Sequence, residues 1–81
     1  MGEQIVRALL QVAFDELHLH RVDLGVFDFN RPAIACYEKV GFQMEGTLRE
    51  SRRHENDYWN LCIMAMLEQE WRERREKNHA D

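Results

Sequence analysis

Residues 26–42 constrain the fold of this 81-residue chain more than any other stretch. An apolar segment that contains β-branched residues precedes Asn30. The short side chain of Asn30 can accept a hydrogen bond from the free N–H groups of a following helix. Pro32 falls in the first turn of that helix, where its missing N–H costs nothing. Gly41 suits the left-handed residue that ends a helix. The stretch therefore predicts a strand end, a short capped helix and a second strand.

Before this stretch, the sequence predicts a helix and then a strand. Apolar residues recur every three or four positions over residues 3–19, which indicates a helix buried over a broad face. The residues expected on that face are Ile5, Leu9, Val12, Ala13 and Leu17, with Val6, Leu10 and Phe14 widening it. Residues 22–27 alternate apolar residues with Asp23 and Gly25, as a strand does.

After the capped helix, the sequence predicts a hairpin and a charged tail. Residues 42–48 form a strand with Gly46 at a bulge, and the polar residues 49–57 end in a turn at 55–57. Residues 58–67 are apolar on both faces apart from Asn60, which predicts a mid-sheet strand buried on both sides. We expect residues 1–71 to form the domain and residues 72–81 a charged, helical or frayed, solvated tail.

Composition limits the classes of function. The net charge is −4 and the basic residues are interleaved with acidic ones, so we expect no nucleic-acid partner. No apolar run reaches about 18 residues and no basic-then-apolar signal opens the chain, so we expect no membrane association. Cys36 and Cys62 lie in apolar runs outside any metal-binding spacing, which favours buried thiols and a cytoplasmic location over a disulfide or metal site.

The His18-Leu19-His20 sequence has two interpretations. Two histidines around one residue could bind a metal ion, but no carboxylate or cysteine lies at ligand spacing. Polar or cationic residues also suit the negative end of a helix dipole. We therefore expect a helix end there and no metal.

Candidate chemistry lies on the capped helix. Asn30 can be a simple N-cap, but a helix N-terminus also offers N–H groups to a ligand. Ala33 and Tyr37 follow at helical spacing, so the three residues can line one groove. The phenol of Tyr37 can donate a proton to a leaving group, although a half-buried tyrosine is more often packing. Lys39 could reach a phosphate or be merely solvated.

The same residues carry a family resemblance. The run from Asn30 to Phe42 resembles the N-x-x-A-I-x-x-Y-E-K-x-G-F signature of GNAT superfamily N-acetyltransferases. Residues 43–50 and the end of the chain down to Trp71 resemble the ribosomal-protein and spermidine/diamine acetyltransferase branch. The resemblance implies an α/β fold, of the α+β kind with a mixed sheet, in the order helix, strand, helix, strand, strand.

The resemblance also implies a reaction. Acetyl-CoA would lie against the strand end and helix, with Asn30 bonding the pantetheine arm and Ala33 leaving space for it. Tyr37 would be the general acid that protonates the CoA thiolate after an amine attacks the thioester directly. Gly2 aligns with the last position of the family's pyrophosphate loop, and Lys39 is the other candidate phosphate contact. The acceptor would be a small amine or a protein N-terminal amine, and no metal is implied.

The departures from the family set further expectations. The first glycine of the pyrophosphate loop and the first four strands of the fold have no counterpart here, so we expect the C-terminal half of the fold. Strand 22–27 would then lie at an open sheet edge, which predicts homo-oligomers through that edge. An alternative to an enzyme is an inactive structural or self-association module. Glu45 and Glu50 could face a cationic amine or simply be charges on a strand surface.

Overall fold

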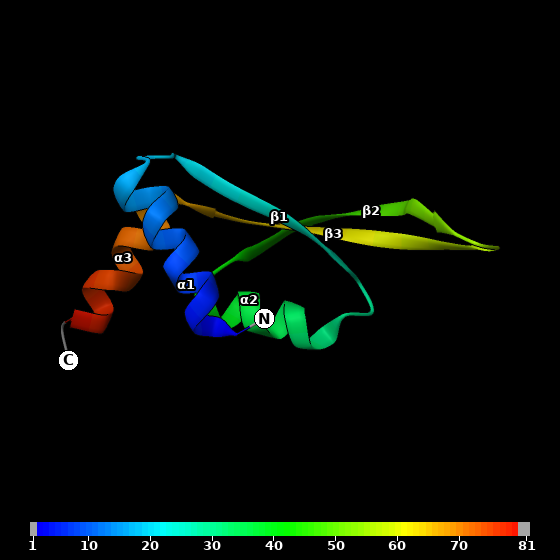
Figure 1. The fold of residues 1–81 in the computed structure, drawn as a ribbon, viewed down its shortest axis with the longest axis horizontal. Coiled ribbons are helices and arrows are strands. Elements are labelled where there is room, and N and C mark those ends of the chain that lie inside the picture. Colours follow the sequence, from blue (N-terminus) through cyan, green and yellow to red (C-terminus); the bar gives the residue numbers. More distant parts are fainter. Residues whose placement is uncertain (1, 80–81) are drawn as a thin grey trace.

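The computed structural model describes residues 2–79, and the side chains of residues 2–74. It confirms the expected order of helix, strand, helix, strand, strand, and the charged end of the chain, expected to be helical or frayed, forms a helix (Figure 1). The elements are α1 (Glu3–Gln11), a π-helical turn η1 (Val12–Glu16), β1 (Arg21–Phe27), α2 (Arg31–Val40), β2 (Gln43–His54), β3 (Asp57–Leu67) and α3 (Glu68–His79).

The three strands form an antiparallel sheet in the order β1-β3-β2. The expected mid-sheet position of β3 is therefore confirmed, and β1 lies at an edge of this sheet. Leu24 of β1 and Met44 of β2 both pair with Met64, so β3 joins the two outer strands along its length. The register shifts between Met44 and Gly46, as expected for a bulge at this glycine. Helices and an antiparallel sheet give the α+β class.

The described helices cover a single face of the sheet. Figure 1 shows α1, α2 and α3 on one side of the strands and no helix on the other. On the covered face, Cys62, Met64 and Met66 are buried. On the opposite face, Leu61 and Ile63 stay half-exposed. The expectation that β3 is buried on both sides is therefore wrong over these residues, because the described elements supply only one helical layer.

The buried face of the first helix is narrower than its apolar pattern. Val6, Leu10 and Phe14 point into the core, whereas Ile5 and Leu9 are 57% and 60% exposed. A strip at spacing of four residues is thus buried, and the neighbouring apolar strip is left on the surface. The prediction of a broad buried face is wrong over the described residues, because the elements packed against α1 cover the strip of Val6 and Leu10 and leave Ile5 and Leu9 outside it.

The expected helix over residues 3–19 ends in a π-helical turn. The Leu17 N–H donates to the carbonyl of Val12 at 2.9 Å, a bond one residue longer than in an α-helix. His18 then adopts a φ of +55°, which ends the helical segment shortly before the predicted residue. The wider turn brings Phe14 into the core, where it is 2% exposed.

Helix α3 is attached to the domain. The Trp71 ring is 7% exposed and stacks on Phe14 with ring centroids 6.0 Å apart. Its indole N–H donates to Asp15 Oδ1 at 3.2 Å, and Arg74 donates to the carbonyl of Lys39 at 2.9 Å. Trp71 lies within the expected domain of residues 1–71, and the charged segment that follows it is helical and exposed as far as Arg74. The side chains of residues 75–81 lie outside the described ones.

The hairpin is longer than predicted. Residues 49–54 continue β2 as a strand, and the turn lies at Glu55 and Asn56, with a φ of +56° at Glu55. The far part of the hairpin extends beyond the helices (Figure 1). The radius of gyration is 14.3 Å, compared with about 12 Å for a compact domain of this length. The polar sequence therefore marks an exposed strand and not a loop.

The two cysteines form no disulfide; Cys62 is buried, while Cys36 is only half-buried, on the wall of a groove. Among the described residues, no group of three histidines, cysteines or carboxylates could hold a metal ion. Within that same part of the chain, no helix has the length and apolarity needed to cross a membrane.

Trp71→Ala should lower the free energy of unfolding by about 3–5 kcal/mol, because it empties a buried aromatic site. Trp71→Phe keeps the ring packing and loses the bond to Asp15, so its cost should be about 1 kcal/mol. Urea unfolding followed by circular dichroism measures both. Wild-type stability in Trp71→Ala would mean that α3 is not anchored by its tryptophan.

Candidate functional site

The N-terminus of α2 is fixed by Asn30. Its side-chain oxygen accepts a hydrogen bond from the Ala33 N–H at 3.4 Å, and its own N–H donates to the Phe27 carbonyl at 3.0 Å. The predicted N-cap is thus confirmed, with Pro32 in the first turn. Among the described residues, the amide nitrogen of Asn30 has no hydrogen-bond partner, so this exposed donor can reach a ligand while the oxygen caps the helix.

One face of α2 holds a small groove of about 180 Å³. The residues that line it are Asn30, Pro32, Ala33, Cys36 and Tyr37. The structure therefore brings together three of the predicted site residues, because positions three and four apart share a helix face. The methyl side chain of Ala33 leaves the middle of the groove open.

Tyr37 also borders a second cavity of about 180 Å³, between α1 and β1. Its other lining residues, mostly apolar, are Val6, Leu9, Leu10, Val22, Asp23, Leu24 and Phe42. The Tyr37 ring packs edge-on against Phe42, with ring centroids 5.6 Å apart. Its hydroxyl has no hydrogen-bond partner within the described part of the chain. The phenol is thus held by packing, with its proton available at the border of two cavities.

Lys39 and Gly2 lie near the other end of α2. Lys39 Nζ is 3.4 Å from a carboxylate oxygen of Glu3, and Glu3 follows Gly2, the N-cap of α1. The Arg7 guanidinium, at 2.8 Å, lowers the pKa of Glu3, with a further contribution from Lys39. A ten-residue helix is about 15 Å long, so this pair and Asn30 do not form one compact site.

Asn60 is the site-shaping residue that the sequence reasoning did not assign. Its side-chain oxygen accepts from the Glu50 N–H at 2.8 Å, and its nitrogen donates to Asp28 Oδ2 at 3.0 Å. The Asp28 N–H returns a bond to the Asn60 carbonyl at 3.2 Å. Asn60 therefore links all three strands just before the cap of α2. The sequence feature that could have identified Asn60 is its position as a polar residue within an otherwise apolar strand.

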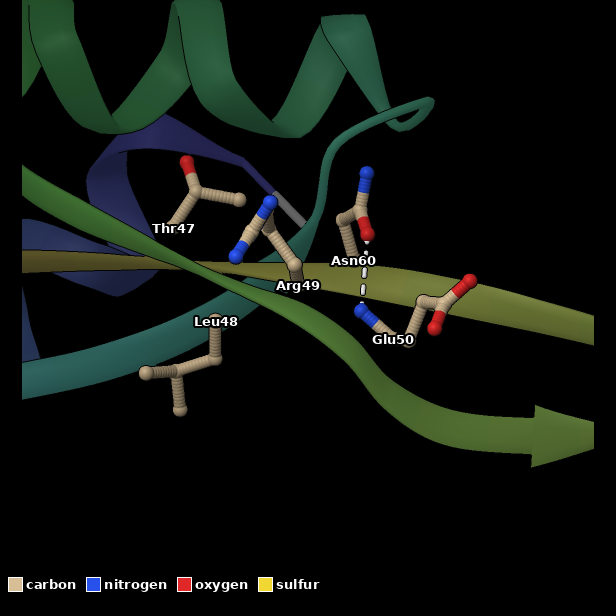
Figure 2. A pocket seen from close by; sticks show the side chains of 5 residues that line it. All are labelled: Thr47, Leu48, Arg49, Glu50 and Asn60. Atoms are coloured by element: carbon tan, nitrogen blue, oxygen red, sulfur yellow. Dashed lines mark hydrogen bonds between the residues drawn. The ribbon is translucent and has the colours of Figure 1, made fainter.

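Next to Asn60 lies an open cavity of about 670 Å³ (Figure 2). Its lining residues are Thr47, Leu48, Arg49, Glu50 and Asn60. Figure 2 shows Thr47, Arg49 and Asn60 on the side of the strands that faces α2, with Leu48 on the other side. None of these residues was a predicted site residue. For Glu50, one of the two interpretations was that its side chain faces a cationic amine.

The model of the Acetyltransferase (GNAT) family matches residues 1–42, which is just over half of the chain. The chain belongs to the GNAT family of acetyltransferases. Members of this family are N-acetyltransferases that use acetyl-CoA as cosubstrate, and the matched segment of this GNAT chain contains α1, β1 and α2.

Individual relatives agree with this assignment. The L-amino acid N-acetyltransferase AaaT of Escherichia coli (strain K12) is 31% identical over 67 residues, which cover 83% of this chain and 41% of AaaT. Mutant forms of the spermidine/spermine N-acetyltransferase SpeG of Vibrio cholerae match with a TM-score of 0.85 and 29% identity, over 89% of this chain and 43% of SpeG.

A dodecameric spermidine N-acetyltransferase structure from Vibrio cholerae matches with a TM-score of 0.81 and 29% identity. That match covers 85% of this GNAT chain and 40% of the other chain. The chain thus spans about two fifths of the length of the relatives that it matches. The acceptors in the names of these relatives differ, so family membership by itself does not identify an acceptor.

Proposed function

We propose that this chain carries the cofactor-contacting and proton-donating helix of an acetyl-CoA-dependent N-acetyltransferase. The observation that supports this best is the groove on α2, lined by Asn30, Ala33 and Tyr37. Those are the positions that the family signature fills with a polar contact, a small residue and a proton donor. The acceptor is a small amine or a protein N-terminal amine.

The residues present fit the pantetheine arm of acetyl-CoA. This arm is narrow, with amide groups along an otherwise apolar chain, so it needs a few hydrogen bonds and an apolar wall. The Asn30 amide nitrogen offers a donor, and Ala33 leaves room beside it. The cavity between α1 and β1 supplies apolar side chains such as Leu10 and Leu24. Because Tyr37 borders both cavities, one extended ligand can meet all of these groups.

In the proposed reaction, the unprotonated acceptor amine attacks the thioester carbonyl carbon. The new C–N bond forms, the C–S bond breaks, and the sulfur leaves with the electron pair. Tyr37 donates its phenolic proton to this sulfur and regains a proton from solvent, while the amine releases its extra proton. The ring contact with Phe42 keeps the phenol in one orientation through this step.

The phosphate groups would lie at the Gly2 and Lys39 end of α2. Gly2 leaves the N-terminus of α1 unobstructed, since no atom lies within 4 Å of where a Cβ would be. Lys39 is bound to Glu3, so a phosphate has to replace the carboxylate as its partner. The two ends of α2 thus suit the two ends of one long ligand.

The two glutamates considered for the acceptor differ in availability. The Glu45 carboxylate accepts two bonds from Arg21, at 2.9 and 2.6 Å. That partner lowers the pKa of Glu45 and occupies its oxygens. Glu50 remains exposed beside the open cavity. A cationic acceptor would therefore meet Glu50 sooner than Glu45.

Titration calorimetry with acetyl-CoA tests the proposal. We expect saturable binding to the chain, and Asn30→Asp should weaken it about tenfold, because the aspartate still caps α2 but cannot donate a hydrogen bond. Arg31→Gln is the matched control, one residue away on the exposed start of the helix, and should bind like wild type. No binding, or equal binding in Asn30→Asp, would contradict the proposed contact.

Tyr37→Phe separates the proton donor from packing in the same experiment. The phenylalanine keeps the contact with Phe42, so the dissociation constant for acetyl-CoA should change by less than about threefold. Thiol release with an amine acceptor should slow about 100-fold. Unchanged turnover would exclude Tyr37 as the general acid.

A second candidate function is a structural module that self-associates through the edge of β1. The exposed Ile5 and Leu9 of α1 continue into Val22 and Leu24 beside that edge. Unpaired strand edges next to apolar surface favour pairing with another chain. Two copies could pair β1 with β1 about a twofold axis and pack their α1 helices together.

Light scattering at micromolar concentration tests the self-association. We expect about twice the 9.8 kDa mass of one chain. Leu9→Glu places a charge in the apolar contact and should give a monomer. Leu17→Glu, at an equally exposed leucine past the π-helical turn, should stay dimeric. A cooperatively unfolding wild-type monomer would rule out this edge as an interface.

A further inference from the structure

The second irregularity of β2 holds an unusual backbone conformation. The register against β3 shifts between Leu48 and Arg52, so residues 49–51 bulge out of the ladder. Within this bulge Glu50 has a φ of +51°, which side-chain-bearing residues seldom adopt. Such conformations persist where the surrounding structure holds them, and they are frequent at ligand sites. The bulge is therefore a candidate ligand site.

Asn60 holds the bulge in place. Its side-chain oxygen binds the Glu50 N–H, which the register shift has removed from the ladder. Its side-chain nitrogen is at the same time anchored on Asp28 at the end of β1. The bulge is thus fixed to the opposite edge of the sheet. A fixed bulge re-aims the side chains next to it, here Arg49 and Glu50.

Arg49 presents an unused cation in the cavity of about 670 Å³. Its guanidinium makes no ion pair and no hydrogen bond within the described residues. By contrast, Arg7, Arg21 and Arg72 each bind a carboxylate. In Figure 2 the Arg49 side chain lies on the α2 side of β2, between Thr47 and Asn60. A planar guanidinium in this state is suited to bidentate binding of a carboxylate.

Glu50 adds the opposite charge to the same cavity. Its carboxylate has no partner among the described residues, and it does not pair with the neighbouring Arg49. Figure 2 shows the Glu50 side chain directed away from Arg49, along β2. A ligand with both a carboxylate and an ammonium group can therefore satisfy both charges at once. A purely anionic ligand would satisfy only Arg49 and would be repelled by Glu50.

We propose that this cavity binds a small zwitterion of the amino-acid class, with its carboxylate on Arg49 and its ammonium group toward Glu50. The Thr47 hydroxyl and the bulge held by Asn60 complete the polar lining. The residues that line this site belong to β2 and β3, with the bulge anchored on Asp28, and the site does not require that α2 bind acetyl-CoA. The site and the proposed function can therefore fail separately.

The test is a titration of the ¹⁵N-labelled chain with three probes of one shape, followed by NMR. L-leucine carries both charges, L-leucinamide lacks the carboxylate and 4-methylpentanoate lacks the ammonium group. We expect leucine to shift the Arg49 Nε–H and Glu50 amide signals saturably. The other two probes should bind at least about tenfold more weakly, since each leaves one charge unsatisfied.

Variants locate the effect at Arg49. Arg49→Gln should weaken leucine binding at least about tenfold. Arg49→Lys should weaken it less, because lysine keeps the positive charge but cannot donate two parallel hydrogen bonds to a carboxylate. Arg53→Gln removes the same charge from an exposed arginine further along β2 and should bind like wild type. The inference is overturned if leucine causes no saturable shift, if leucinamide binds equally well, or if Arg49→Gln binds like wild type. A response of Arg49 to inorganic phosphate and not to leucine would overturn it as well.

Discussion

Pairing of β3 with both neighbouring strands is the constraint on which the rest of this structure depends. Every residue from Cys62 to Ala65 pairs with both β1 and β2, so the outer strands are placed relative to one central element. The apolar side chains Cys62, Met64 and Met66 then form the floor on which the helices pack. Because β1 is fixed in this way, the position where the chain leaves the sheet for α2 is fixed too.

Asn60, a polar residue in this apolar strand, connects the strand arrangement to the candidate site. It ties Asp28, two residues before the cap of α2, to the bulge at Glu50 on the other side of β3. The groove of Asn30 and Tyr37 and the cavity beside Arg49 are thus set by the same strand. In the proposed enzyme, one rigid element would place both the proton donor on α2 and the charged pair on β2.

The parts of this arrangement that the sequence predicts correctly are those that depend on residues close together in the chain. The Asn30 cap bonds a residue only three positions away, and Gly41 reaches a φ of +127° because its own missing side chain permits it. The parts that were missed depend on distant contacts. Asn60 bonds Asp28 across 32 positions, and Trp71 reaches Asp15 across 56. The choice of Leu10 over Leu9 as the buried leucine likewise depends on which faces the rest of the fold covers.

The measurement that tests the central claim most directly is a map of backbone amide shifts during titration of the chain with acetyl-CoA. The account predicts that the largest saturable shifts fall on residues 30–37 of α2 and on Leu24 of β1, which border the two cavities shared by Tyr37. Saturable binding that leaves these amides unmoved would contradict the assignment of α2 as the cofactor-contacting helix.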